Sequence, residues 1–153
     1  MTSTIAGTID GKVVWSDDMS VGCSALDDDH KILIQALNDF IEALENDEGV
    51  FVTDGIFMVL LDYTNFHFAR EEAIMKACGY AGFEDHVKTH GELKEQLMDA
   101  RTRYMRNPSP DLEDEIRDFL LSWLQSHILV RDMDYKGRVA ASGQDLDSIL
   151  ANI

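Results

Sequence analysis

The sequence is poor in basic residues, in cysteine and in proline, and it has no long apolar run. Lysine and arginine together number 13 against 29 aspartates and glutamates, which gives a formal net charge of -16 over 153 residues. A surface of this charge repels nucleic acid and anionic lipid, so we expect neither as a partner. No apolar stretch reaches the length that spans a bilayer, and residues 1–10 lack the basic and apolar regions of a signal peptide. These absences predict a cytoplasmic protein without membrane insertion.

The two cysteines, Cys23 and Cys78, lie far apart and form no C-x-x-C motif. Because the chain is not a small disulfide scaffold either, we expect both thiols to be reduced. Its length suits one domain that buries a core of its own. We therefore expect a single domain over residues 1–153, with an N-terminal arm (1–26), a helical bundle (27–135) and a C-terminal tail or short helix (136–153).

Four segments repeat apolar residues every three or four positions, which is typical of amphipathic helices with one buried face. No alternating strand pattern competes with them. We predict an all-α fold, an up-and-down antiparallel four-helix bundle with an N-terminal arm that packs Trp15 against it. The expected boundaries are the cap Asp27-Asp28-Asp29 for the first helix, Thr53 or Asp54 and Cys78-Gly79 for the second, Phe83 and Pro108 for the third, and the cap Asp111 for the fourth.

All five histidines fall on the predicted inner faces of these helices. A single buried histidine is more often a hydrogen-bonded core residue than a metal ligand. Here, however, His67 with Glu71 and His86 with His90 are i, i+4 pairs, whose side chains lie side by side on a helix. Burying five imidazoles and their carboxylates would leave many polar groups without partners, whereas a metal centre would satisfy them together. The pattern therefore predicts a metal site.

Asp132 follows His127 by five residues, and in an α-helix this spacing turns the two side chains about 140° apart. Helix geometry alone favours an exposed acid at the end of the fourth helix. For Asp132 to join His127 at one site, the helix must end or distort between them.

The order and spacing of these residues resemble the hemerythrin family, in particular its bacterial single-domain members. The motifs that carry the resemblance are His30, then His67-Phe-Ala-Arg-Glu71, His86-Val-Lys-Thr-His90 and His127-Ile-Leu-Val-Arg-Asp132. The resemblance implies a cofactor of two non-haem iron ions bridged by a solvent-derived oxygen. It further implies that His86, His90 and His127 bind one iron, that His30 and His67 bind the other, and that Glu71 and Asp132 bridge both.

The same resemblance implies that one coordination position stays open on the iron with two histidines, and that dioxygen binds there reversibly. Such a position separates a reactive metal site from a closed, structural one. Reversible binding needs apolar walls that keep water out. The positions that match the family's oxygen pocket are Phe68, Trp123, Leu124 and Ile128.

We therefore expect an oxygen carrier, store or supply protein rather than an enzyme. The ligands leave open an oxygen or redox sensor, an enzyme acting on peroxide or nitric oxide, and an iron reservoir, and they do not identify a protein that receives the oxygen. A ferritin-like oxidase would need a Glu-x-x-His motif on each of two helices, and this motif is absent. A dinuclear zinc hydrolase fits the ligand count loosely, but an apolar pocket offers no group that binds a polar substrate.

Overall fold

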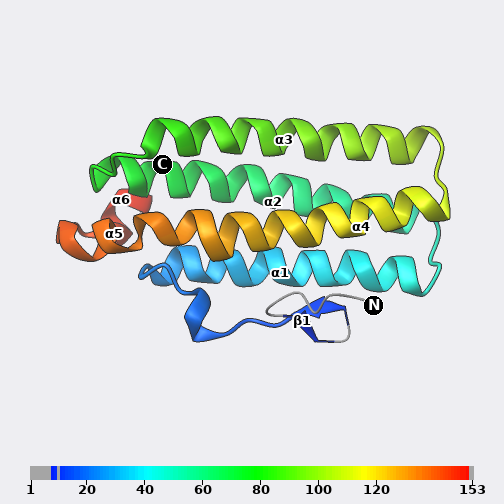
Figure 1. Cartoon of the computed structure of the whole chain (residues 1–153), viewed down its shortest axis with the longest axis horizontal. Coiled ribbons are helices and arrows are strands. Elements are labelled where there is room, and N and C mark those ends of the chain that lie inside the picture. The colour runs from blue at the N-terminus through cyan, green and yellow to red at the C-terminus, as the bar shows by residue number, and fades with distance from the viewer. Residues whose placement is uncertain (1–7, 10, 152–153) are drawn as a thin grey trace.

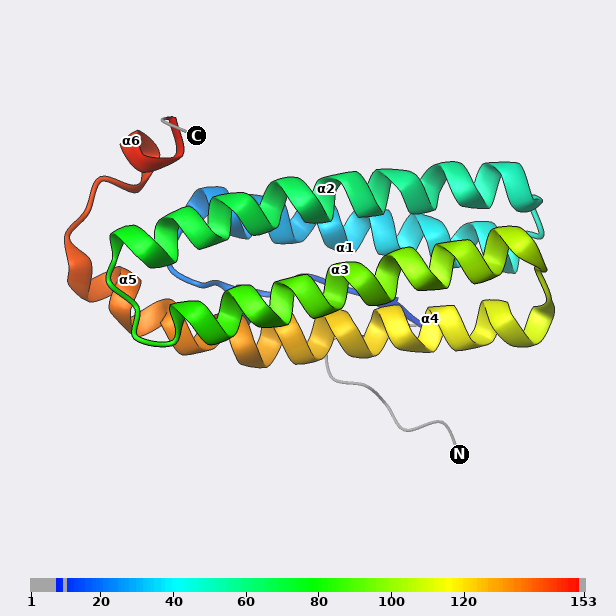
Figure 2. The same cartoon turned by 90° about the horizontal axis from the view of Figure 1, so that it is seen from above.

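The computed structural model describes residues 8–9 and 11–151, and the side chains of residues 8–9 and 128–130 lie outside this description. Four long helices run side by side along the molecule, and consecutive helices run in opposite directions (Figure 1, Figure 2). Helix α1 contacts both α2 and α4, so the four helices close into a bundle. The predicted all-α, up-and-down architecture is confirmed. The helices are α1 (Ser24–Glu45), α2 (Val50–Ala77), α3 (Phe83–Arg106) and α4 (Pro110–Leu124).

Helix α1 begins at Ser24, so the acidic triplet Asp27-Asp28-Asp29 lies inside the helix and does not cap it. Asp27 accepts a hydrogen bond from the Ser20 hydroxyl at 2.6 Å and another from the Val21 N–H at 2.9 Å. Asp29 is buried and accepts a hydrogen bond from α2. The predicted cap was wrong: Asp27 bonds to the segment just before the helix, and Asp29 bonds to Tyr63 of α2.

Helix α2 begins at Val50, ahead of the predicted start near Thr53 or Asp54. It ends at Ala77, and Gly79 follows with a φ of 68°. Glycine adopts this left-handed conformation without strain, and it commonly follows the last helical residue. The predicted end of this helix is therefore confirmed.

Helix α4 is capped by Ser109 rather than by the predicted Asp111. The Ser109 hydroxyl accepts a hydrogen bond from the Leu112 N–H at 3.1 Å. Pro110 occupies the first turn. A backbone N–H at this position has no partner within the helix, so the N–H that proline lacks costs no hydrogen bond. Asp111 lies within that first turn, where its charge suits the positive end of the helix dipole.

Beyond α4 the chain continues as a π-helical segment, η2 (Gln125–Arg131), and a 3-10 turn, η3 (Asp132–Tyr135). In a π-helix the backbone bonds join residues five apart, so residues at this spacing come close to one face. This is the distortion that the spacing of His127 and Asp132 required, and both side chains are buried. The interpretation of Asp132 as an exposed acid is therefore wrong.

The described segments before and after the four long helices pack on the bundle. The N-terminal arm carries an antiparallel pair of short strands, β1 (Thr8–Ile9) and β2 (Lys12–Val13), and a 3-10 turn, η1 (Asp17–Met19). Trp15 packs against the bundle core, as predicted. The C-terminal residues form α5 (Lys136–Ser142) and α6 (Leu146–Ala151) at one end of the bundle, where α6 contacts α2 (Figure 2). Within the described chain, no helix combines the length and apolar character that crossing a membrane requires.

Two apolar clusters fill the interior, and a polar layer lies between them. The larger cluster occupies most of the bundle, and the smaller one lies under α5 and α6. On α2, Glu71 stands between Phe68 of the larger cluster and Ile74 of the smaller one. On α1, His30 stands between Leu33 of the larger cluster and residues of the smaller one. The predicted metal ligands therefore form a layer across the bundle rather than a surface patch.

Candidate metal centre

The structure brings all seven predicted ligands together inside the bundle, and none is more than 3% exposed. We call them the histidine-carboxylate cluster. Every long helix, or its continuation, contributes at least one member, so the cluster depends on the assembled bundle. Its members are His30 from α1, His67 and Glu71 from α2, His86 and His90 from α3, His127 from η2 and Asp132 from η3.

The donor atoms fall into two groups, and the atoms within each group lie within 4.8 Å of one another. Both groups contain Glu71 and Asp132. Glu71 lies between them, because its Oε1 is 2.8 Å from His86 Nε2 and its Oε2 is 3.0 Å from His67 Nε2. The carboxylates are therefore placed to bridge two ions. The first group adds His86, His90 and His127, and the second adds His30 and His67.

The imidazoles face one another in a way that suits metal binding. The Nε2 atoms of His30 and His67 are 3.0 Å apart, and the Nε2 atoms of His90 and His127 are also 3.0 Å apart. A hydrogen bond between two imidazole nitrogens needs one nitrogen that carries a proton and one that does not. When both nitrogens bind a metal, each lone pair points at the ion and no proton is needed between them.

Three carboxylate oxygens of the cluster, Glu71 Oε2 and both Oδ atoms of Asp132, are buried without a hydrogen-bond partner among the described residues. Each nevertheless lies close to an imidazole nitrogen. Asp132 Oδ1 is 3.0 Å from His86 Nε2, and Asp132 Oδ2 is 3.1 Å from His30 Nε2. These oxygens lie close to the imidazole nitrogens without the geometry of a hydrogen bond. The lone pairs of the carboxylates and the imidazoles therefore point into the same space between them. Because a buried charged oxygen without a partner is costly, the residues present fit a centre of two metal ions.

The charges in the cluster shift its pKa values strongly. Burial lowers the pKa of His30, but the neighbouring carboxylates of Asp132 and Glu71 outweigh burial and raise it to about 10. The same balance raises the pKa of His86 to about 9. Burial raises the pKa of Glu71, yet hydrogen bonds from the histidines hold it well below its usual range. At neutral pH the metal-free cluster therefore pairs imidazolium ions with carboxylates.

Metal binding is expected to release protons and to weaken as pH falls. Metals bind deprotonated imidazole, and His30 and His86, with pKa values of about 10 and about 9, both carry protons at neutral pH. Glu71 stays ionised because its pKa is lowered, so it adds no competing proton. Each of these two protons should cost about 10-fold in apparent affinity for each unit that pH falls below about 8, and the raised pKa of His67 adds to this slope. Ferrous iron titrated against a chelator at several pH values measures this slope, and an affinity that does not change with pH would contradict it.

Two histidines are held from behind by carboxylates that the sequence did not single out as functional. His67 Nδ1 lies 3.0 Å from Asp29 Oδ2, and His90 Nδ1 lies 2.9 Å from Glu72 Oε1. Such partners fix the tautomer and the orientation of a metal-binding imidazole. Each acid is next to a predicted ligand in the sequence, Asp29 before His30 and Glu72 after Glu71, and this is the signal that could have found them.

The apolar side chains expected in an oxygen pocket are buried beside the cluster. The Phe68 ring stacks on His90, with centroids 3.7 Å apart and planes 3° from parallel. Trp123 meets Phe68 edge-on at 6.4 Å, and Leu124 belongs to the same apolar cluster. The side chain of Ile128, also expected there, lies outside the described residues. Of the described side chains of this wall, Phe68 contacts the ligands directly, and Trp123 packs against Phe68.

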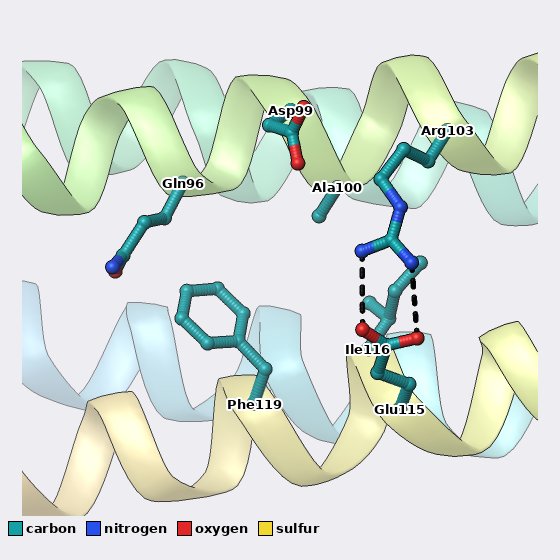
Figure 3. Close-up of a pocket in the computed structure, with 7 residues that line it drawn as sticks. All are labelled: Gln96, Asp99, Ala100, Arg103, Glu115, Ile116 and Phe119. Atoms are coloured by element: carbon teal, nitrogen blue, oxygen red, sulfur yellow. Dashed lines mark hydrogen bonds and ion pairs between the residues drawn. The ribbon is translucent and has the colours of Figure 1, made fainter.

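A separate groove lies between α3 and α4, farther along α3 than the predicted ligands (Figure 3). Arg103 crosses the groove and donates to both carboxylate oxygens of Glu115, at 3.1 Å each. No member of the histidine-carboxylate cluster lines it, so it is not part of the candidate centre. Its lining residues are Gln96, Asp99, Ala100, Arg103, Glu115, Ile116 and Phe119.

Comparison with known proteins gives consistent matches. The family model described as the hemerythrin HHE cation binding domain matches residues 21–139. A bacteriohemerythrin of Pseudomonas aeruginosa (strain LESB58) is 31% identical over 134 residues, which cover 88% of this chain and 86% of the relative. A bacteriohemerythrin of Stenotrophomonas maltophilia (strain R551-3) is 33% identical over 129 residues, which cover 84% of this chain and 82% of the relative.

More distant matches agree with these. A myohemerythrin of Sipunculus nudus is 29% identical over 126 residues, which cover 82% of this chain and 92% of the relative. The crystal structure of a hemerythrin mutant superposes with a TM-score of 0.67 at 23% identity, covering 84% of this chain and 98% of the other. At this identity the structural likeness supports the bundle fold alone.

Proposed function

Because the chain belongs to the hemerythrin family, we propose that its histidine-carboxylate cluster holds two non-haem iron ions and that this centre binds dioxygen reversibly. The observation that carries the proposal is the division of the donors into two groups that share Glu71 and Asp132. In this assignment Glu71 and Asp132 would hold both irons, and the remaining ligands of each iron would be the histidines of its group. These are His86, His90 and His127 for one iron, and His30 and His67 for the other.

The two groups differ by one histidine, and we propose that this difference sets where dioxygen binds. When bound, the iron pair supplies the electrons and the coordination position that dioxygen needs. The chain supplies three imidazoles to one group and only His30 and His67 to the other. A group with fewer protein ligands leaves room for a small molecule, as in metal sites that keep an open position.

The apolar wall supports reversible binding rather than turnover. Phe68, Trp123 and Leu124 are buried next to the cluster, and the family places Ile128 beside them. Apolar side chains exclude water and offer no general acid or base to a substrate. We therefore infer an oxygen carrier, store or supply protein that is not an enzyme, with dioxygen as its small-molecule partner.

We also propose a cytoplasmic location. Both cysteines, Cys23 and Cys78, are free thiols buried in the smaller apolar cluster. Free thiols are typical of reducing compartments. The formal charge of -16 supports the further proposal that the protein does not bind nucleic acid.

The test is an oxygen cycle on protein loaded with iron. The protein is reduced anaerobically, exposed to dioxygen and then returned to anaerobic conditions while its visible absorption is recorded. We expect two irons per chain and a visible band that forms with dioxygen and disappears on its removal over repeated cycles. Zinc-loaded protein is the control, because zinc has no redox chemistry and should give no band.

Other outcomes would assign the centre differently. Iron that oxidises at once without a reversible band would favour a redox sensor or an enzyme. Rapid consumption of added peroxide or nitric oxide would favour the enzyme directly. A chain that binds no iron would overturn the assignment of all seven ligands.

A further inference from the structure

One histidine of the cluster is tied to a second polar network that reaches the edge of the bundle. The Asp29 side chain, only 4% exposed, lies behind His67, and its Oδ2 is 3.0 Å from His67 Nδ1. The same oxygen accepts from Arg70 Nε at 2.9 Å. The other oxygen accepts from the Tyr63 hydroxyl at 3.0 Å. Asp29 is therefore held by three donors. One of them, Arg70, is itself packed against an aromatic ring, because its guanidinium lies 5.0 Å from the Phe66 ring centre.

This arrangement determines which nitrogen of His67 faces the metal site. An ionised carboxylate accepts hydrogen bonds and cannot donate them, so the proton of the bond to Asp29 belongs to Nδ1. That leaves Nε2 on the opposite side of the ring, 3.0 Å from Glu71 Oε2 and 3.0 Å from His30 Nε2. Asp29 therefore fixes both the tautomer of His67 and the direction of its lone pair.

Three of the other histidines have weaker support or none among the described residues. Glu72 accepts from His90 Nδ1 at 2.9 Å, but its side chain is 26% exposed. The Nδ1 atoms of His30 and His127 are buried and have no hydrogen-bond partner in the described part of the chain. The support is thus concentrated on one residue of the group that has only two histidines.

We propose that Asp29, locked by Tyr63 and Arg70, is the positioning residue for the two-histidine half of the metal centre. The inference rests on the proposed di-iron function and names a residue that acts through His67 without touching the metal. The two-histidine group has fewer protein ligands, so the affinity for its ion depends more strongly on the orientation of each imidazole. The carboxylate also polarises the Nδ1–H bond, which makes His67 a stronger donor to the ion.

The test compares iron release from Asp29→Asn and wild-type protein. Both are loaded with ferrous iron without oxygen and mixed with excess chelator. Asp29→Asn keeps the shape of the side chain and loses its charge, so the iron held by His30 and His67 should leave about 10- to 100-fold faster than in wild type. The iron held by the three-histidine group should leave at the wild-type rate, giving one fast and one slow phase. Mössbauer spectra should show one altered iron and one unaltered iron.

Two variants control this experiment. Asp28→Asn removes the same charge next door, but the Asp28 side chain is 71% exposed and pairs only loosely with Lys31, at 3.8 Å, so release should stay at the wild-type rate. Glu72→Gln removes the carboxylate behind His90 and should leave the iron of the two-histidine group unchanged. If Asp29→Asn does not fold, Tyr63→Phe removes one of the two donors that lock Asp29 with no change of charge, and it should accelerate release of the same single iron by a smaller factor.

The outcomes separate this inference from the proposed function. Equal acceleration of both irons, no acceleration, or the same effect from Asp28→Asn would overturn the role of Asp29 while the wild-type protein still cycles oxygen. A wild-type protein that holds two irons but shows no reversible oxygen band would overturn the oxygen assignment alone. A wild-type protein that binds no iron would overturn both.

Discussion

Replacing Glu71 by glutamine should leave the protein with at most one tightly held iron and without the reversible oxygen band. Glu71 is buried, and its two oxygens face different groups of the cluster: Oε1 is 3.0 Å from His90 Nε2, and Oε2 is 3.0 Å from His67 Nε2. An amide offers one oxygen and an NH2 group, so one of the two sides would meet a donor where an ion is held. The loss should exceed the roughly 10- to 100-fold that removal of an outer partner costs. Metal analysis and the oxygen cycle measure it.

Glu92→Gln is the matched control for this prediction. Glu92 lies on α3, two residues after His90, but its side chain is exposed and it is not a member of either donor group. The control should keep two irons and the oxygen band. Circular dichroism of the metal-free proteins would show whether Glu71→Gln retains the helical fold. A folded Glu71→Gln protein with two tightly held irons would contradict a bridging role for Glu71.

The helices, and the placement of paired candidate ligands on one helix face, could be predicted because each depends on local information. Amphipathic periodicity marks the inner face of a helix, and the i, i+4 spacing of His67 with Glu71 places both on it. The helix end before Gly79 followed from the conformational freedom of glycine. What these features share is that neighbouring residues determine them, so no knowledge of the partner helices was needed.

The end of the fourth helix shows where local information is insufficient. The spacing of His127 and Asp132 required a distortion but did not specify its kind, because α-helix, π-helix and helix end all compete within a single turn. The structure contains a π-helical segment, Gln125–Arg131, which carries His127 and leads directly into Asp132. π-helical turns are rare and occur frequently at functional sites. The wider π-helical turn brings both His127 and Asp132 into the buried cluster, which explains why this turn is retained here.

The acids at the start of α1 show a second limit. Asp27-Asp28-Asp29 has the composition of a helix cap, yet Asp29 contributes to the support of His67 from α2. Capping is a preference worth about 1 kcal/mol, so a tertiary network with Arg70 and Tyr63 can override it. These partners follow Asp29 by 41 and 34 residues, and no periodic pattern connects positions so far apart.

The C-terminal residues could not be assigned from periodicity because the two helices there, Lys136–Ser142 and Leu146–Ala151, are each too short to repeat an apolar pattern. In the structure Leu146, Ile149 and Leu150 pack against the smaller apolar cluster, which includes Tyr135. Arg138 anchors the segment by donating from Nε to the backbone carbonyl of Cys78 at 2.6 Å. The smaller cluster closes the bundle beside the polar layer, so these short helices cover one side of the candidate metal centre.

Replacing Phe68 by alanine should destabilise the metal-free protein by about 3–5 kcal/mol and accelerate oxidation of the iron-loaded protein in air. The Phe68 ring is fully buried, stacks on His90 and lies 5.4 Å from the His127 ring centre. Its removal would leave a cavity next to the ligands, and a cavity with polar groups at its wall admits water. Water at the centre favours irreversible oxidation over release of dioxygen. Urea unfolding of the metal-free protein and the decay of the oxygen band measure the two effects.

Phe51→Ala is the control, because it makes the same change in α2 at a side chain that is 89% exposed. Its stability should stay within about 0.5 kcal/mol of wild type, and its oxygen band should decay at the wild-type rate. The two readouts for Phe68 separate packing from chemistry. Lost stability with an unchanged decay rate would show that Phe68 is part of the apolar core but not a barrier to water. Faster decay in a variant that still binds two irons would place Phe68 in the wall that keeps oxygen binding reversible.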